Sequence, residues 1–357
     1  MSSQTTDIVS NGDVDFYFTG VQQAYLRALK GNNRALYPKF AFVPPATGMT
    51  TSKFPMDLPG GRQALGTRVK FPVSLAASRP EDWPYGTARK VEPFSQIEIS
   101  VDLKRWAPPA KQEQWDIFTN DIFGIIKDQL PQMMDRSMVL WDMVLADVLA
   151  ANAAWQPDNI AFFTPTGTRH EANPFKPGVA NFYNDVPITG MDVPQMRFLL
   201  GLLENAPGPD GLPLDTDEVD IIALGPTSDF CFQLKQVFQA AIAAQAVGAN
   251  AAAGVSNMLV GAARVELYKQ LARTKTQPRD SAGVALDRTK VGYLLAVPKG
   301  EGKPIALVPS RQPTPFYHGL NGNDYLRATE GAMQYGWDAF GQGVLVIPQR
   351  ALRFYIP

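Results

Sequence analysis

The sequence is poor in the residues that proteins use for thiol and metal chemistry. Its 357 residues include one cysteine, Cys231, and two histidines, His170 and His318. One thiol cannot form an intrachain disulfide or supply a cysteine-rich zinc site. Two imidazoles are too few for a multi-histidine metal centre. Disulfide-stabilised scaffolds and cysteine-rich zinc sites are therefore excluded, and a multi-histidine metal site is not expected.

The sequence also lacks a charge excess and a long apolar run. It has 33 Lys and Arg against 34 Asp and Glu, a net charge of -1, which argues against binding nucleic acid mainly through bulk charge. The longest weakly polar stretch, Ala240 to Ala263, is rich in Ala and Gly and lacks the bulky side chains of a membrane span. Met1 to Asn11 shows no signal-peptide pattern. We therefore expect a soluble intracellular protein.

Sequence motifs for common active sites are missing as well. The chain has no GxSxG, HExxH or GxxxxGK[ST], and no GxGxxG after a strand. The stretch from Gly300 to Lys303 precedes a proline rather than a helix, so we interpret it as a hairpin turn. At Gly225 to Ser228 free backbone N–H groups could bind an anion, but an N-cap by Thr227 or Ser228 is the simpler interpretation. We expect no catalytic, cofactor-binding or metal-binding residues, and hence no enzyme.

The isolated polar candidates have ordinary structural interpretations. His170 lies in a polar loop without a nucleophile or an orienting carboxylate at a useful spacing, so we expect a surface histidine. His318 follows two aromatic residues and is interpreted as their structural neighbour. Cys231 falls within an apolar helical pattern and is expected to be buried. The acidic residues Asp215, Asp217, Glu218 and Asp220 could bind a cation, although a solvated turn before a buried strand is the preferred interpretation.

The N-terminal region predicts a helix and carries a basic cluster. Apolar residues at spacings of three and four predict a helix from about Asp15 to Lys30. This helix either packs on its own domain or forms an arm against a neighbouring subunit. The basic residues after it form either a solvated helix end or a surface that faces a polyanion; they are Arg27, Lys30, Arg34 and Lys39.

Glycine and proline are abundant, with 29 and 30 residues, and proline concentrates between Asn32 and Pro93. A stretch of this length without a helical pattern is usually functional or disordered. This stretch keeps many aromatic residues, among them Phe40, Phe71, Trp83 and Tyr85, which disordered segments lack. It therefore predicts an extended arm and a long hairpin that bury their apolar side chains on a partner, for example another chain.

The next segments predict a strand and a long helix. Residues alternate between apolar and polar from Phe94 to Leu103, which is typical of a strand with one wet face. Two apolar stripes then predict a helix, or two helices end to end, from about Lys111 to Asn152 with a kink at Pro131. Such a helix would measure about 60 Å. We therefore expect an elongated molecule.

Helices and strands interleave in the C-terminal half, which predicts a compact α/β unit. The expected elements are helices from Asp192 to Asn205 and from Thr227 to Gln239, and strands at 219–224, 264–267, 290–297 and 304–308. Residues 328–340 and 344–355 are expected to form an antiparallel pair around the turn Gly341-Gln-Gly, beside the strand that ends at Leu103. The fold class is therefore α+β, with the α/β unit inserted between two parts of one domain.

Five stretches carry a resemblance to a known family. They are Tyr37-Pro-Lys-Phe-Ala-Phe-Val, the segment from Phe94 to Trp106, Phe118 to Leu149 followed by Phe162-Phe163-Thr and His170, Leu224-Gly-Pro-Thr-Ser-Asp-Phe, and Gln334-Tyr-Gly-Trp. In their order along the chain they resemble the major capsid proteins of tailed bacteriophages, which have the Hong Kong 97-type fold. The chain looks most like the Mu-like major head subunit family. The stretches Ala240 to Gly254 and Arg273 to Asp287 have no counterpart in it.

This resemblance implies an organisation into four parts. Residues 1–53 would be an N-terminal arm, and 54–93 an extension loop. Residues 94–185 and 326–357 would form a peripheral domain with a long spine helix, and 186–325 an axial α/β domain. The implied function is self-assembly into hexamers and pentamers of an icosahedral shell around double-stranded DNA, without a cofactor.

The resemblance also implies partners and contact residues. Lys70, Phe71, Trp83 and Tyr85 of the extension loop would contact neighbouring subunits, and the basic cluster would face DNA, which is bound without sequence specificity. Because the chain begins almost directly with the arm, we expect a separate scaffolding protein, together with a portal and a decoration protein but no membrane. The protein would be located in the virion and assembled in the bacterial host cytoplasm.

Three other classes remain open at this stage. An encapsulin-like compartment uses the same fold to hold enzymes rather than DNA. An enzyme with an α/β core would need a nucleophile, base or phosphate loop, and the sequence offers none. A tail or baseplate protein is less consistent with one very long helix beside an α/β insertion.

Overall fold

The computed structural model describes most of the chain in two compact units. The described residues are 35–58, 62–76, 95–107, 110–113, 132, 135–175, 177–178, 180–213, 219–240, 258–299, 302–318 and 332–357. The first unit comprises Met1–Ala35, Leu103–Trp141 and Pro309–Gln342; the second comprises Leu36–Asp102, Asp142–Val308 and Gly343–Pro357. The predicted helix at 15–30 and the kink at Pro131 lie outside the described residues.

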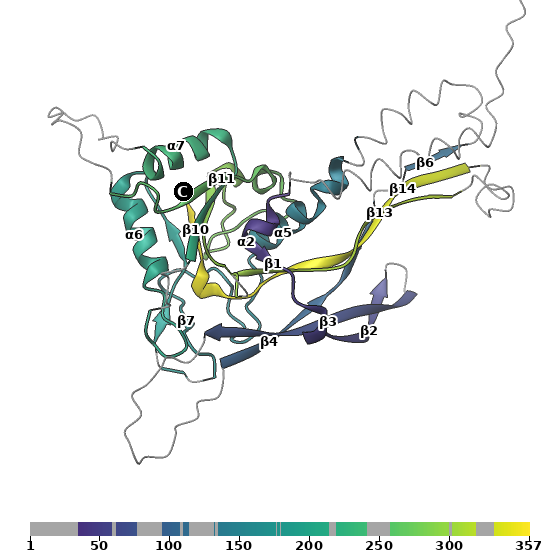
Figure 1. Cartoon of the computed structure of the whole chain (residues 1–357), viewed down its shortest axis with the longest axis horizontal. Coiled ribbons are helices and arrows are strands. Elements are labelled where there is room, and N and C mark those ends of the chain that lie inside the picture. Colours follow the sequence, from purple (N-terminus) through teal and green to yellow (C-terminus); the bar gives the residue numbers. More distant parts are fainter. Residues whose placement is uncertain are drawn as a thin grey trace, which may run out of the picture. The chain divides into compact units, whose positions relative to one another are not determined.

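A five-stranded sheet forms the centre of the second unit (Figure 1). Its order is β11 (Arg264–Leu267), β10 (Val219–Gly225), β12 (Val291–Pro298), β15 (Ala351–Tyr355) and β9 (Asp185–Pro187). β10 is parallel to β11 and antiparallel to β12, β12 is antiparallel to β15, and β15 is parallel to β9. The short apolar runs of β10 and β12 are typical of strands that are covered on both faces.

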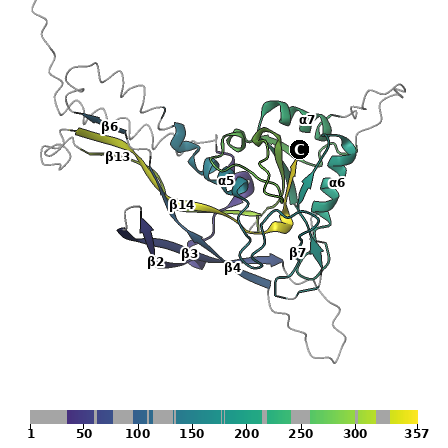
Figure 2. The ribbon, with the colours of Figure 1, turned by 180° about the vertical axis from the view of Figure 1, so that it is seen from behind.

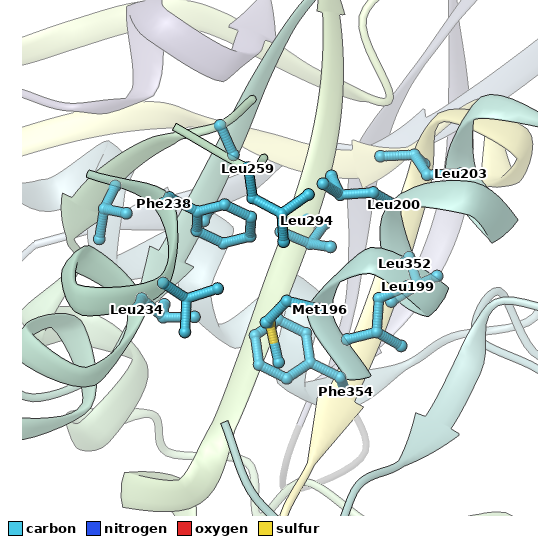
Figure 3. Packing of buried hydrophobic residues seen from close by; sticks show 14 of the residues in the cluster. Met196, Leu199, Leu200, Leu203, Leu234, Phe238, Leu259, Leu294, Leu352 and Phe354 are labelled. Atoms are coloured by element: carbon cyan, nitrogen blue, oxygen red, sulfur yellow. The ribbon is translucent and has the colours of Figure 1, made fainter. Parts of the chain in front are cut away.

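Two helices cover one face of this sheet. α6 (Val193–Glu204) and α7 (Ser228–Phe238) begin where the sequence predicted, because Asp192 accepts a hydrogen bond from Gln195 N at 2.8 Å and Thr227 accepts one from Phe230 N at 3.2 Å. Their apolar faces meet side chains of the sheet in one buried cluster (Figure 3). The cluster includes Met196, Leu199, Leu200 and Leu203 of α6, Leu234 and Phe238 of α7, and Leu294, Leu352 and Phe354 of the sheet.

The opposite face of the sheet packs against the loop that follows α5 (Leu140–Ala151). Tyr293 and Arg353 alternate with the cluster residues along their strands and therefore point to this other face. Phe163 of the loop lies 5.4 Å from the Tyr293 ring, and the guanidinium of Arg353 lies 5.4 Å from the Phe163 ring. The loop carries the short paired strands β7 (His170–Glu171) and β8 (Asn181–Phe182).

The predicted long hairpin is confirmed. β2 (Thr50–Leu58) pairs antiparallel with β3 (Arg62–Ala76), and β3 pairs antiparallel with β4 (Ser95–Asp102), so three strands form one sheet (Figure 2). The alternation predicted for the last strand is also confirmed, since Ile97, Ile99 and Val101 are buried whereas Gln96, Glu98 and Asp102 are exposed. We call this sheet the extension.

A second five-stranded sheet contains two strands of 14 residues each. Its order is β1 (Ala41–Phe42), β13 (Ile305–His318), β14 (Ala332–Leu345) and β5 (Lys104–Trp106), with β6 (Ala110–Glu113) also paired to β14. The remaining described elements are the short helix α2 (Tyr37–Phe40) and the 3-10 turns at Ala46–Gly48, Lys269–Arg273, Arg288–Lys290 and Pro348–Arg350. The α+β class is therefore confirmed.

Four local predictions were wrong, three of them because pairing with a distant segment decided the outcome. The turn predicted at Gly341-Gln-Gly lies inside β14, and β15 joins the other sheet. Lys111 belongs to β6, which pairs with β14, and not to a helix. The strands on either side of the hairpin turn predicted at 300–303, β12 and β13, do not pair with each other, because they belong to different sheets. The extended piece predicted from Lys39 begins inside α2.

Gly292 of β12 gives a prediction about core packing. A Cβ atom at this position would lie 2.5 Å from Cζ of Phe354 and 2.8 Å from Cζ of Phe230, whose rings stack. Because both rings are buried, Gly292→Ala is expected to lower the free energy of unfolding by about 1–3 kcal/mol in denaturant titrations. Gly201→Ala is the matched control: no atom lies within 4 Å of its Cβ position, and alanine there favours helix α6. Equal effects of both changes would contradict this packing.

Candidate functional site

The His, Cys, Asp and Glu side chains of the described residues are not gathered into a metal-binding cluster. No group of three or more His, Cys, Asp or Glu side chains that could hold a metal ion occurs among them. No helix in the described part of the chain has the length and apolarity to cross a bilayer. Cys231 is 3% exposed, as predicted, and burial raises the pKa of its thiol. The polar groups that organise the described residues are instead a buried histidine, a buried ion pair, a buried carboxylate and a charged sheet face.

His170 is buried, so the prediction of a surface histidine was wrong. Its Nδ1 lies 2.6 Å from Oδ2 of Asp158 and its Nε2 lies 3.0 Å from the carbonyl oxygen of Phe162. The ring stacks on Phe182 and meets the edge of Trp155. Both nitrogens are occupied by acceptors and neither reaches a nucleophile, so the geometry fits a structural role that closes the loop after α5. The nearby aromatic pair Phe162-Phe163, which is also buried, is the sequence feature that could have indicated a buried loop.

Arg353 and Asp185 form an ion pair that the sequence reasoning missed. They are direct partners in the register of β15 and β9, and the guanidinium donates two hydrogen bonds to the carboxylate, at 2.8 and 2.6 Å. Both side chains are almost completely buried. Burial raises the pKa of Asp185, although the guanidinium opposes that change. The sequence feature that could have indicated this ion pair is a single arginine within the otherwise largely apolar strand Ala351–Tyr355.

Asp142, near the start of α5, is a buried carboxylate that fastens a distant segment. Its two oxygens accept hydrogen bonds from Leu36 N at 3.0 Å and Tyr37 N at 2.8 Å. Burial raises the pKa of Asp142 to about 6, and the two backbone hydrogen bonds only partly offset this rise. The Tyr268 hydroxyl donates to the backbone carbonyl of Asp142, and the Tyr268 ring packs on Phe40. The segment before β1 is therefore held to the second unit by polar and aromatic contacts together.

Only one member of the predicted basic cluster can be placed. The ammonium group of Lys39 lies 2.7 Å from a carboxylate oxygen of Glu266, and the same oxygen lies 2.7 Å from Nε of Arg264. Two cations thus share one carboxylate at this point of the surface. Arg27, Lys30 and Arg34 lie outside the described residues, so their predicted role stays a prediction.

The extension separates the two predicted contact residues that are described. Phe71 is 1% exposed and packs against Phe42 of the same chain, at 6.3 Å between ring centroids. Lys70 points to the opposite face, where it pairs with Glu98 at 2.7 Å, and Arg68 pairs there with Asp102 at 2.6 Å. We call these four residues the charged face of the extension. Trp83 and Tyr85 lie outside the described residues.

The charged face consists of two rows of opposite sign. β3 carries the bases Arg68 and Lys70, β4 carries the acids Glu98 and Asp102, and all four side chains are at least 41% exposed. Exposed cross-strand pairs add little to stability, typically below 1 kcal/mol. A face of this kind can instead orient another surface that carries complementary rows.

Comparisons with known proteins give distant structural likenesses only. No protein-family model and no curated protein matches the sequence. The structure is similar to the capsid of cyanophage P-SCSP1u (TM-score 0.48, 12% identity, 81% of this chain and 83% of that one). It is also similar to Mycobacterium phage Patience (0.45, 8%, 99% and 90%) and to a virus-like particle from Pyrococcus furiosus (0.42, 9%, 95% and 99%). At these scores and identities, family and function have to be argued from the geometry of this chain.

Proposed function

We propose that this chain is a major capsid subunit with the Hong Kong 97-type fold, related to the Mu-like major head subunits. Copies of it form hexamers and pentamers of an icosahedral shell around double-stranded DNA. The order of elements carries the proposal: a hairpin extension, strand β4, helix α5, a sheet covered by α6 and α7, and then the long strands β13 and β14. The resemblance in the sequence implied this order.

The proposed division follows from that order. Residues 1–53 form the arm, 54–93 the extension loop, 94–185 and 326–357 the peripheral domain, and 186–325 the axial domain. One strand departs from this division: β15 lies within 326–357 but pairs with β12, in the sheet of the proposed axial domain. A separate scaffold, a portal and a decoration protein complete the proposed particle, which is assembled in the bacterial host.

The extension is the proposed clasp between subunits. One of its faces is buried on its own chain through Val69, Phe71 and Ile99, which leaves the charged face for a neighbour. Lys70 then lies at the contact, and Trp83 and Tyr85 are proposed to join it. Because each subunit repeats the contact, a modest interface is sufficient for a stable shell.

Electron microscopy of the purified protein tests the proposal as a whole. We expect hollow polyhedral shells, either from the protein alone or after addition of its scaffold. Particles purified from cells should contain double-stranded DNA. Particles that contain an enzyme and no DNA would support an encapsulin-like compartment instead, and a protein that remains monomeric under all assembly conditions would contradict a shell.

Removal of the extension tests the clasp. Deletion of residues 62–87 is expected to abolish shells and leave a soluble monomer, as measured by sedimentation velocity. A finer test is the double variant Arg68→Glu and Lys70→Glu, which reverses one charged row and is expected to reduce assembly strongly. Its matched control is Lys235→Glu with Lys290→Glu, which makes the same charge change away from the extension. Normal shells from the deletion would refute the clasp.

A further inference from the structure

Both ring nitrogens of His170 face hydrogen-bond acceptors. Nδ1 lies 2.6 Å from Oδ2 of Asp158, and Nε2 lies 3.0 Å from the carbonyl oxygen of Phe162. A carbonyl oxygen and an ionised carboxylate can accept hydrogen bonds but cannot donate them. The ring is completely buried, so its nitrogens have to be satisfied by these neighbours. The geometry therefore calls for a proton in each of the two contacts.

A neutral imidazole beside an ionised carboxylate cannot satisfy both contacts, because it carries one N–H group. Its other nitrogen would direct a lone pair at an oxygen atom, and two buried polar groups would lose their hydrogen bond. An imidazolium ion beside ionised Asp158 satisfies both contacts, and so does a neutral ring beside protonated Asp158. These two arrangements hold the same number of protons. The closed geometry thus holds one proton more than a neutral ring beside an ionised carboxylate.

The two acceptors are fixed in place by other donors. Oδ1 of Asp158 accepts from Ile160 N at 3.0 Å, and the carbonyl oxygen of Phe162 also accepts from the Asn184 side chain at 3.0 Å. Neither acceptor can turn away from the ring without giving up a second hydrogen bond. We call residues 152–169, between α5 and β7, the closing loop. Because both acceptors belong to this loop, loss of the proton is expected to open it.

The other charged side chains near the ring have separate partners. Glu171 accepts from a backbone N–H group at 3.0 Å, and the guanidinium of Arg169 donates to a backbone carbonyl of the closing loop at 3.2 Å. On the sheet that the loop packs against, Arg353 binds Asp185 through two hydrogen bonds. Among the charged side chains that the structure describes, the direct partner of the ring is Asp158.

The closing loop also holds the extension. Ser100 N of β4 donates to the side-chain oxygen of Gln156 at 2.8 Å, and the side-chain nitrogen of Gln156 donates to Ser100 O at 2.6 Å. The carboxamide supplies the acceptor and donor that an adjacent strand would supply to β4. The residue before it, Trp155, makes a T-shaped contact with His170, at 5.6 Å between ring centroids. The hold on β4 therefore depends on the position that the His170 contacts give to the loop.

We propose that the proton shared by His170 and Asp158 is a pH-sensitive latch: it keeps the closing loop shut, and its loss releases Gln156 from β4 of the extension. The open loop can exchange this proton with water, whereas the closed loop requires it, so closure is favoured at low pH and weakens as the pH rises. Histidine side chains in general change charge between about pH 5 and about pH 8. The inference concerns contacts within one chain and does not depend on the proposed function.

Asp158→Asn tests the latch. The new carboxamide keeps an oxygen for Ile160 N and can turn its NH2 group toward Nδ1 of a neutral ring, whose Nε2–H group then donates to Phe162 O. The variant should therefore stay closed without the extra proton. In unassembled full-length chains, we expect the Ser100 amide of the unaltered protein to exchange its hydrogen roughly tenfold faster than that of the variant at about pH 8, and at a similar rate at about pH 5.

Asp192→Asn is the matched control. Asp192 also accepts a backbone hydrogen bond, from Gln195 N at 2.8 Å, but it caps α6 and does not belong to the closing loop. This control should keep the pH dependence of the unaltered protein. Burial raises the pKa of Asp142 to about 6, but this group is the same in all three proteins, so its contribution cancels in the ratio of rates. A ratio that is the same at both pH values in folded proteins would overturn the proposal.

The unaltered protein offers a second measurement that needs no variant. The nitrogen NMR shifts of the His170 ring report the loss of the proton, and their titration midpoint should coincide with the rise in Ser100 exchange above its intrinsic pH dependence. If Asp158→Asn melts well below the unaltered protein, this comparison decides alone. Ser100 exchange that does not follow the titration of the ring would equally refute the latch.

Discussion

Replacing Arg353 by methionine is expected to lower the free energy of unfolding by about 3–5 kcal/mol. The change leaves the buried Asp185 carboxyl without its two guanidinium hydrogen bonds, so it must either remain charged without a partner or take up a proton. Because Asp185 is buried, water cannot replace them. The strands β15 and β9, which this pair joins in register, should separate first. Denaturant titration of the unassembled protein, followed by circular dichroism, measures the loss.

Two further variants separate the buried charge from general loss of packing. The double variant Arg353→Met with Asp185→Leu removes both charges and should recover most of the stability, because an apolar pair of similar volume often replaces a buried ion pair without loss. Arg264→Met is the matched control, since Arg264 also pairs with a carboxylate but is exposed, and its loss should cost less than about 1 kcal/mol. If the double variant is as unstable as the single one, the ion-pair explanation is wrong.

Replacing Asp142 by asparagine is expected to remove a pH dependence of stability of about 2–3 kcal/mol. Burial raises the pKa of Asp142 to about 6 in the folded protein, compared with 3.8 for the unperturbed group. The folded state therefore binds the proton more tightly than the unfolded state. The stabilisation is complete below about pH 4 and is lost as the pH rises through about 6, because the buried carboxylate then becomes charged.

The groups around Asp142 do not mask this effect. Burial raises the pKa values of Tyr37 and Tyr268 above 10, so neither tyrosine titrates between pH 4 and pH 8. Denaturant titrations across this range should show a steeper loss of stability in the unaltered protein than in Asp142→Asn. Asp147→Asn is the matched control, because Asp147 also lies on α5 and accepts a backbone hydrogen bond, from Lys275 N at 2.6 Å. A control variant that flattens the profile as much as Asp142→Asn would contradict the assignment.

Local signals explain why much of the fold could be predicted. Strand β4 alternates because one face is buried and the other is wet, and α6 and α7 begin at Asp192 and Thr227 because their side chains accept N–H groups of the first turn. The proline-rich hairpin also followed from composition and aromatic content. Each of these signals depends on residues that are close together in the chain, so the corresponding helix or strand can be predicted from a single sequence.

The candidate functional residues were harder to predict. His170 has polar neighbours in the sequence, but its environment comes from Asp158, Phe162 and Phe182, which the loop brings together. Asp142 meets backbone groups more than 100 residues away. In the extension, Phe71 is buried and Lys70 is exposed. Alternation along β3 predicts that these neighbouring side chains point to opposite faces. Only the pairing of β3 with β4 shows which of the two faces is buried.

By itself, the amino-acid sequence determined what the chain lacks and which segments favour helix or strand. One cysteine, two histidines and balanced charge followed from counting, and the positions of proline within each strand were set by the sequence alone. Only the tertiary structure decided which strands are neighbours, and hence that β14 passes straight through Gly341 to Gly343 and that β15 joins the other sheet. The physical reason is that side-chain and backbone preferences are local, whereas the partner of a strand is selected by burial and hydrogen bonding across the whole chain.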